Sequence, residues 1–151
     1  MVLVESSGLY HAARPLGSIK LFSDLEVQYL KSQPLARIAT ASPEGVPEVS
    51  PVGFQYDDGL IYVGSHDQSI FFMTKRYHNV KSGNTRVCIV VDDLVSMDPW
   101  TVRGIKITGD AEIISHTGMF GPGKYLKITP VTSRSWGIEP SEGPFGPTKT
   151  H

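Results

Sequence analysis

The stretch LARIATASPEGVPEVSPVGFQYDDGLIYVGS, residues 35–65, decides the fold. Its β-branched and aromatic residues form short runs, which are separated by the turn signals Ser42-Pro43-Glu44-Gly45 and Asp57-Asp58-Gly59. Tight turns of this kind join neighbouring strands into hairpins. The stretch therefore predicts three strands, at Leu35 to Ala41, Val46 to Tyr56 and Leu60 to Ser65.

Helices are predicted on both sides of this strand region. Ser23-Asp24-Leu25-Glu26 is a capping box, in which the Ser hydroxyl and the Glu carboxylate satisfy exposed amide donors. Phe22 and Val27 are placed as its hydrophobic staple, and Pro34 limits this helix to about three turns. Apolar residues at helical spacing within residues 69–82 predict a second helix, which crosses over between strands.

The remaining pattern again indicates strands. These are predicted at Thr85 to Asp92, at Trp100 to Ser115 with a bend near Gly109, and at Lys124 to Ile138 after a loop at Met119 to Gly123. About six strands with two or more short helices predict a mainly β, six-stranded barrel. The chain then divides into an N-terminal arm (1–20), a barrel domain (21–139) and a Pro- and Gly-rich mobile tail (140–151).

Composition limits the partners of this domain. The chain of 151 residues has 14 Lys and Arg against 15 Asp and Glu, which provides no general attraction to nucleic acid or to an anionic membrane. Cys88 is the only cysteine, so no disulfide forms within the chain. No apolar run is long enough to span a bilayer. We expect a cytoplasmic protein with no nucleic-acid or membrane partner.

Several common motifs are absent from the sequence. It contains no phosphate-binding Walker loop, no zinc-binding cysteine pair and no histidine pair at metal-ligand spacing. The order of Gly118, Gly121 and Gly123 does not match a dinucleotide fingerprint. Asp92, Asp93 and Asp98 lie at and beyond the end of a predicted strand, where a run of acids more often forms a turn than a metal site. We therefore predict neither a metal site nor a catalytic nucleophile.

Four cations lie close together in this nearly neutral chain. Lys75, Arg76, Lys81 and Arg86 fall within twelve residues, around the crossover helix and the strand after it. Such a group is typical of a phosphate site, because Arg provides a planar fork of donors and Lys a point charge. A solvated helix face has the same composition, and composition alone favours that second interpretation.

Two motifs resemble a known superfamily over residues 22–138. Thr74-Lys75-Arg76, followed by Asn79-Val80, resembles the phosphate clamp of the pyridoxamine 5'-phosphate oxidase-like split barrels, and Arg103 to Gly109 resembles one of their strands. This resemblance implies a split β-barrel homodimer that binds FMN or the deazaflavin F420. Its cofactor is expected in a groove between the two subunits.

Within the superfamily, three segments look most like an actinobacterial deazaflavin-dependent subgroup: Lys75 to Lys81, Val90 to Asp93 and Ser135 to Ile138. Gly104 occupies the place of a glutamine that contacts FMN in the vitamin oxidases. The resemblance therefore implies an F420-dependent oxidoreductase that transfers a hydride between the deazaflavin and a small unsaturated or quinone-like substrate. Alternatives are an FMN-dependent, pyridoxamine phosphate oxidase-like enzyme and a non-catalytic protein that binds a flavin, haem or small ligand.

The resemblance also assigns roles to individual residues. For Val52 and Val63 the barrel interior is an equal alternative to a cofactor contact, and Trp136 is also typical of a core anchor. The substrate pocket is expected to include Met119, Phe120 and Trp136. The expected cofactor-binding residues are Val49, Ser50, Pro51, Val52, Val63, Gly64, Ser65, Thr74, Lys75, Arg76, Asn79, Arg103 and Lys106.

Overall fold

The structure is a computed structural model that describes residues 21–140 and 146–151. The predicted arm, residues 1–20, lies outside this part. The described elements, in chain order, are α2 (Asp24–Ser32), β1 (Leu35–Ala41), β2 (Pro47–Asp57), β3 (Leu60–Val63), α3 (Gln68–Met73), α4 (Lys75–Lys81), β4 (Arg86–Met97), β5 (Trp100–Gly118), β6 (Gly121–Trp136) and β7 (Lys149–Thr150).

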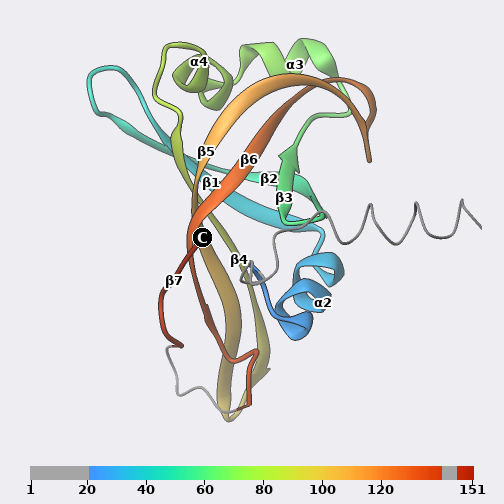
Figure 1. The fold of residues 1–151 in the computed structure, drawn as a ribbon, viewed down its shortest axis with the longest axis vertical. Helices are drawn as coiled ribbons and strands as arrows, with labels where there is room; N and C mark the ends of the chain where they lie inside the picture. Colours follow the sequence, from blue (N-terminus) through green and yellow to red (C-terminus); the bar gives the residue numbers. More distant parts are fainter. Residues whose placement is uncertain (1–20, 141–145) are drawn as a thin grey trace, which may run out of the picture.

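All seven described strands belong to one antiparallel sheet in the order β3-β2-β1-β4-β5-β6-β7. A further pairing between β3 and β6 closes the sheet into a barrel. Figure 1 shows α3 and α4 together at one end of this barrel, and the hairpin between β4 and β5 at the opposite end. The predicted split barrel is confirmed, with a short seventh strand added to the six that were expected.

The core follows from the alternation of side chains along the strands. Ile38, Ile89 and Ile107, on three neighbouring strands, are at most 1% exposed. The residues that alternate with them along each strand face outward. The outward side is called the outer face below. The predicted bend in β5 is also present, because the register with β6 shifts between Thr108 and Gly109. A Cβ on Gly109 would come within 2.6 Å of the Thr129 carbonyl oxygen, so the close approach requires glycine.

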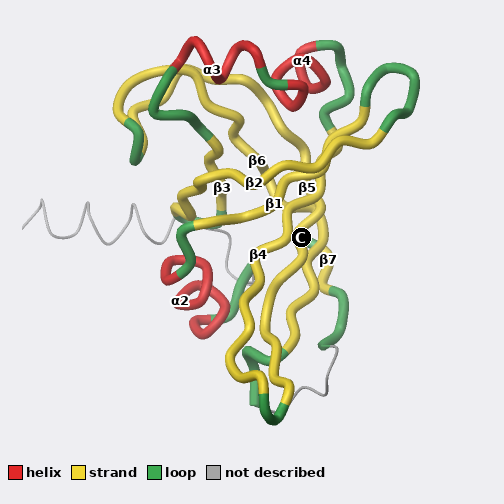
Figure 2. The backbone as a smooth tube through the Cα atoms, turned by 180° about the vertical axis from the view of Figure 1, so that it is seen from behind, coloured by secondary structure: helices red, strands yellow, loops and turns green. Residues whose placement is uncertain are grey.

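The crossover differs from the single helix that was predicted. Thr74 has extended backbone angles (φ −76, ψ 146) and divides the segment into α3 and α4. Its hydroxyl donates to the Phe71 carbonyl (2.8 Å) and accepts from the Tyr77 amide (3.3 Å), so one side chain ends the first helix and caps the second. The tube in Figure 2 shows the two helices as separate red segments.

The capping box of α2 is confirmed, since Ser23 accepts from the Glu26 amide and Glu26 accepts from the Ser23 amide. Glu26 is also fully buried, and its carboxylate accepts from Ser135 Oγ (2.9 Å) and from Lys149 Nζ (2.6 and 2.5 Å). Residues 146–151 of the predicted mobile tail therefore contain a strand that is held to the core. The ion pair between Lys149 and Glu26 stabilises this Pro- and Gly-rich segment, which has little apolar surface to bury.

Two strand boundaries were also predicted incorrectly. β6 begins at Gly121, so most of the predicted loop from Met119 to Gly123 is strand, and only Met119 and Phe120 form the turn. β4 continues beyond Asp92 to Met97, because it pairs with β5 as far as Trp100. Cross-strand pairing thus extends both hairpins beyond the limits that local propensity indicates.

Candidate functional site

Within the basic run Thr74 to Asn79, Arg76 has a donor group without a partner among the described residues. It is half-buried, and its Nη1 donates to Ser50 Oγ on β2 at 3.3 Å. Its Nε–H is buried and has no hydrogen-bond partner among the described residues. Burial lowers the pKa of Arg76, while the carboxylate of Glu48 acts in the opposite direction. A buried N–H without an acceptor is costly, so this site fits an anion that supplies one.

The neighbours of Arg76 differ in their freedom to bind a ligand. Lys75 is exposed beside it at the start of α4. Thr74 uses its hydroxyl for the two helix ends. Asn79 is buried, and its Nδ2 donates to Thr40 Oγ1 on β1 at 2.9 Å, so its side chain attaches α4 to the barrel. Arg76 and Lys75 therefore remain as the cations of this run that are available to an anion.

The predicted ring-binding segment of β2 is divided between the two sides of the strand. Val49 and Pro51 lie on the outer face and are exposed. Val52 is buried in the core at 4% exposure, and Val63 on β3 is fully buried. For these two valines the structure shows a barrel interior, which leaves ring contact by the segment to Val49, Pro51 and the backbone.

The next two predicted residues, on the β3–α3 connection, have defined local roles. Gly64 provides room for a side chain of β6, because a Cβ there would come within 2.4 Å of Tyr125 Cε2. Ser65 Oγ accepts from the Asp67 amide at 3.2 Å, which fixes the turn before α3. Glycine is thus required at position 64 by packing within the chain.

Arg103 and Lys106 were predicted to act on one cofactor, but they face opposite sides of β5. Lys106 is exposed on the outer face. Arg103 faces the other side, where it pairs with Asp93 (2.9 Å) and lies over the Tyr29 ring at 5.0 Å. The hydrogen bonds from Arg103 and Tyr29 lower the pKa of Asp93, and burial with Asp93 raises the pKa of Tyr29. Asp93 therefore occupies two of the donors of Arg103 within the chain.

The predicted substrate residues are also separated, but along the outer face, because β1 and β4 lie between β2 and β5. Met119 and Phe120 form the turn before β6, whereas Trp136 is the last residue of β6. The Phe120 ring covers Gly53 on β2, where an added Cβ would come within 2.6 Å of Cζ. Trp136 covers Gly104 on β5. One chain therefore does not bring Trp136 into a common pocket with Met119 and Phe120.

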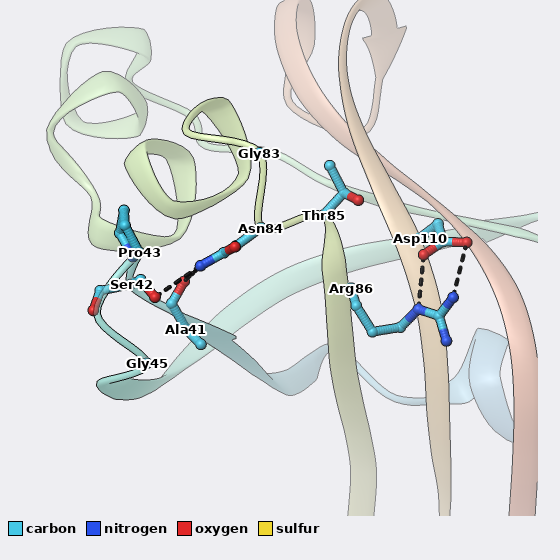
Figure 3. A pocket seen from close by; sticks show the side chains of 9 residues that line it. All are labelled: Ala41, Ser42, Pro43, Gly45, Gly83, Asn84, Thr85, Arg86 and Asp110. Carbon is cyan, nitrogen blue, oxygen red and sulfur yellow. Dashed lines mark hydrogen bonds and ion pairs between the residues drawn. The ribbon is translucent and has the colours of Figure 1, made fainter.

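Sequence patterns did not indicate a polar hollow of about 570 Å³ between the β1–β2 turn and the α4–β4 turn. Asn84 Nδ2 spans it, donating to the carbonyls of Ala41 (3.0 Å) and Ser42 (2.7 Å). Arg86 pairs with Asp110 at its wall (Figure 3). Because these polar groups satisfy one another, the hollow lacks the unpaired group that marks the Arg76 site.

Comparison with known proteins gives consistent matches. The model of the pyridoxamine 5'-phosphate oxidase family matches residues 23–135. The 5a,11a-dehydrotetracycline/5a,11a-dehydrooxytetracycline reductase of Streptomyces rimosus is 32% identical over 124 residues, which are 78% of this chain and 84% of the relative.

Two solved structures share the fold at low sequence identity. The conserved hypothetical protein Rv2991 of Mycobacterium tuberculosis has a TM-score of 0.59 and 18% identity, over 79% of this chain and 88% of that one. An F420 reductase has a TM-score of 0.53 and 21% identity, over 70% of this chain and 94% of that one. With the family match over most of the barrel and the relative at 32% identity, the chain belongs to the pyridoxamine 5'-phosphate oxidase family of oxidoreductases.

Proposed function

We propose that this protein is an F420-dependent reductase that transfers a hydride from the reduced deazaflavin to a conjugated organic substrate. Two comparisons support this function. The relative from Streptomyces rimosus is named as a reductase of dehydrotetracyclines, and a protein of the same fold is named as an F420 reductase. Within the described residues no helix is both long and apolar enough to cross a membrane.

The observation that carries this proposal is the buried Nε–H of Arg76, which has no partner among the described residues. F420 contains a phosphodiester and a carboxylate-bearing tail, so its binding requires a cation with free donors. Arg76 and Lys75 would hold the phosphate, with Ser50 already oriented by Arg76 Nη1 at 3.3 Å. The exposed side chains of Val49 and Pro51 provide an apolar strip of β2 for a flat ring.

The chemistry divides between the cofactor and the chain. When bound, reduced F420 supplies a hydride, so that it loses two electrons while the β-carbon of an enone gains them, and a solvent proton completes the reduced C–C bond. Water would be excluded from the reacting carbon by apolar side chains of this strip. These are Val49 and Pro51 on one side, and Met119 and Phe120 at the end of the strip. The substrate class that fits the relative is a fused-ring enone.

Parallel titrations test which cofactor the protein binds more tightly. Purified protein is titrated with F420 and with FMN while the fluorescence of its two tryptophans is recorded. Both cofactors carry a phosphate, but only F420 has the carboxylate-bearing tail. One added charged contact to this tail contributes about 1.5 kcal/mol, so we expect saturable binding of F420 that is roughly tenfold tighter than that of FMN. Tighter binding of FMN would assign the protein to the FMN-dependent alternative.

A turnover assay separates an enzyme from a binder. Oxidation of reduced F420 is followed by absorbance with a panel of enones, quinones and nitro compounds. The proposal expects oxidation that depends on both the protein and a conjugated acceptor. If F420 binds but no acceptor in the panel is reduced, the protein is a non-catalytic cofactor carrier.

We also propose that the protein acts as a homodimer through the outer face. Three large apolar side chains lie on that face outside the strip of β2, where a monomer would expose them to water: Leu35 (55% exposed), Leu94 (40%) and Val102 (42%). A second copy would bury them and close the groove beside β2. Sedimentation should show a dimer at micromolar concentration, and Leu35→Asp should give a monomer. Met73→Asp, at an exposed position on α3, is the matched control.

A further inference from the structure

The turn between β5 and β6 is held by side chains from other parts of the barrel. Its two residues are Met119 and Phe120, which we call the hairpin tip. Gln55 Oε1 on β2 accepts from the Met119 amide at 3.0 Å. Tyr125 Oη accepts from the Phe120 amide (3.1 Å) and donates to the Gly121 carbonyl (2.7 Å). Both amides of the hairpin tip are therefore bonded to side chains.

A second clamp holds the strand next to the hairpin tip. Gln68, the first residue of α3, accepts from the Lys124 amide at 2.7 Å and donates to its carbonyl at 3.4 Å. These two bonds reproduce the pairing that a neighbouring strand would make with β6. The hairpin is thus attached both to β2 and to α3.

Tyr125 has a fixed position beneath the hairpin tip. It is 1% exposed, and its ring fills the space left by the missing side chain of Gly64. The His116 ring meets it edge-on at 5.2 Å and stacks on Tyr62 at 4.2 Å. Since this aromatic group holds the ring, the Tyr125 hydroxyl is a rigid anchor for the Phe120 amide.

The hairpin tip lies at the end of the apolar strip of β2. Val49, Pro51 and Gly53 share the outer face, and the Phe120 ring packs directly on Gly53. The His66 ring lies 6.1 Å from the Phe120 ring. Met119 is 53% exposed beside it, so an apolar surface is open to a ligand that lies on the strip.

We propose that the hairpin tip is a rigid wall that selects flat, fused-ring substrates, and that Tyr125 is the positioning residue of this wall. Phe120 is then the specificity-determining residue, because a flat polycycle covers both its ring edge and Met119, whereas a single ring reaches only one of them. A flexible turn would adapt to either substrate. This inference rests on the proposed reductase function and assigns the residues that select the fused-ring class at the same site.

The test compares two removals of a tyrosine hydroxyl. Tyr125→Phe keeps the ring against Gly64 and removes the anchor of Phe120. Tyr62→Phe is the matched control, because among the described residues the Tyr62 hydroxyl makes no hydrogen bond with the hairpin tip. Each variant is assayed with reduced F420, a four-ring enone and 2-cyclohexenone.

For Tyr125→Phe we expect the KM of the four-ring enone to rise by roughly fivefold or more, with kcat and the cyclohexenone KM unchanged. Tyr62→Phe should match the wild type, and Phe120→Leu should also raise the KM of the four-ring enone. Equal effects of Tyr125→Phe on both substrates, or no effect on either, would overturn the proposal. A purely structural loss would lower the melting temperature and affect both substrates alike.

Binding measurements keep this inference separate from the cofactor. If no protein variant oxidises reduced F420, calorimetric titration with the four-ring enone still measures how much the hairpin tip contributes to the affinity for this ligand. A roughly fivefold loss of affinity for the four-ring enone in Tyr125→Phe would then support the selective role of the hairpin tip, independently of the reductase activity. Amide exchange of Phe120 gives a second readout, because its protection should fall in Tyr125→Phe and persist in Tyr62→Phe. Unchanged protection and unchanged binding would contradict the inference.

Discussion

Glu26 and Arg76 both place charge in the interior of the protein, but their surroundings differ. Glu26 is fully buried near the start of α2, and its carboxylate accepts from the Ser23 amide, Ser135 Oγ and Lys149 Nζ. Arg76, at the end of the barrel covered by α4, has one contact of 3.3 Å with Ser50 and a buried Nε–H without a partner among the described residues.

The difference indicates what each charge is for. A buried charge that is fully satisfied stabilises its own fold, since removing its partner leaves a costly isolated ion. A buried donor that lacks an acceptor decreases the stability of the ligand-free protein, and an anionic ligand offsets that cost. Glu26 should therefore respond to mutation through stability, and Arg76 through ligand affinity.

The largest effect is expected when the partner of Glu26 is removed. Lys149→Met leaves the buried carboxylate without its cation and should lower the free energy of unfolding by about 3 kcal/mol, the lower end of the range for broken buried pairs, because Lys149 is itself 33% exposed. Urea unfolding followed by fluorescence measures this change.

Lys127→Met is the matched control for that experiment. Lys127 also pairs with a glutamate, Glu112, but that carboxylate is 61% exposed and stays hydrated when its partner is lost. The control should be close to the wild type in stability. Equal losses for Lys149→Met and Lys127→Met would show that the buried pair does not hold β7 to the barrel.

Arg76→Met should have the opposite profile. We expect the Kd for F420 to rise roughly 10- to 100-fold, because hydrogen bonds to charged groups contribute about 1.5–3 kcal/mol each. The free energy of unfolding without cofactor should stay the same or rise, since the variant removes an unsatisfied donor. Lys81→Met removes the same charge from the other end of α4 and should leave the Kd unchanged. A Kd that is equal in both variants contradicts the assignment of Arg76.

The sequence indicates these two charges to different extents. Arg76 belongs to a contiguous motif, so its residue types and spacing are visible without a structure. Glu26 was visible as the last residue of a capping box, but its partner Lys149 is 123 positions away. Local patterns do not report such pairs, and a Pro- and Gly-rich segment therefore resembled a mobile tail.

The same limit explains the other differences between prediction and structure. Local propensity does not show that Thr74 divides the crossover, because its hydroxyl bonds to both helices at once. Arg103 matched a family strand, yet strand register places Asp93 opposite it and gives the guanidinium an internal partner. The positioning role proposed for Tyr125 depends on Gly64, which lies on another strand connection.

Arg103→Met tests whether Arg103 acts within the chain and not on the cofactor. It removes a partly exposed ion pair with Asp93 and the contact over the Tyr29 ring, so a loss of about 1 kcal/mol in unfolding free energy is expected. F420 affinity should equal that of the wild type, because Arg103 faces away from the outer face, which carries the apolar strip of β2. A Kd raised as much as in Arg76→Met would show that Arg103 belongs to the cofactor site.

The smallest expected effect is a change in acid sensitivity. Hydrogen bonds from Arg103 and Tyr29 lower the pKa of Asp93 below its ordinary value of 3.8. Because the folded-state pKa is the lower one, this stabilisation is present above pH 3.8 and is lost as the pH falls through the folded value. Melting temperatures of Arg103→Met should therefore decline less between pH 5 and pH 3 than those of the wild type. Arg76→Met, which removes no cation bonded to a carboxylate, should keep the wild-type slope, so equal slopes in both variants would mean that Asp93 does not depend on Arg103.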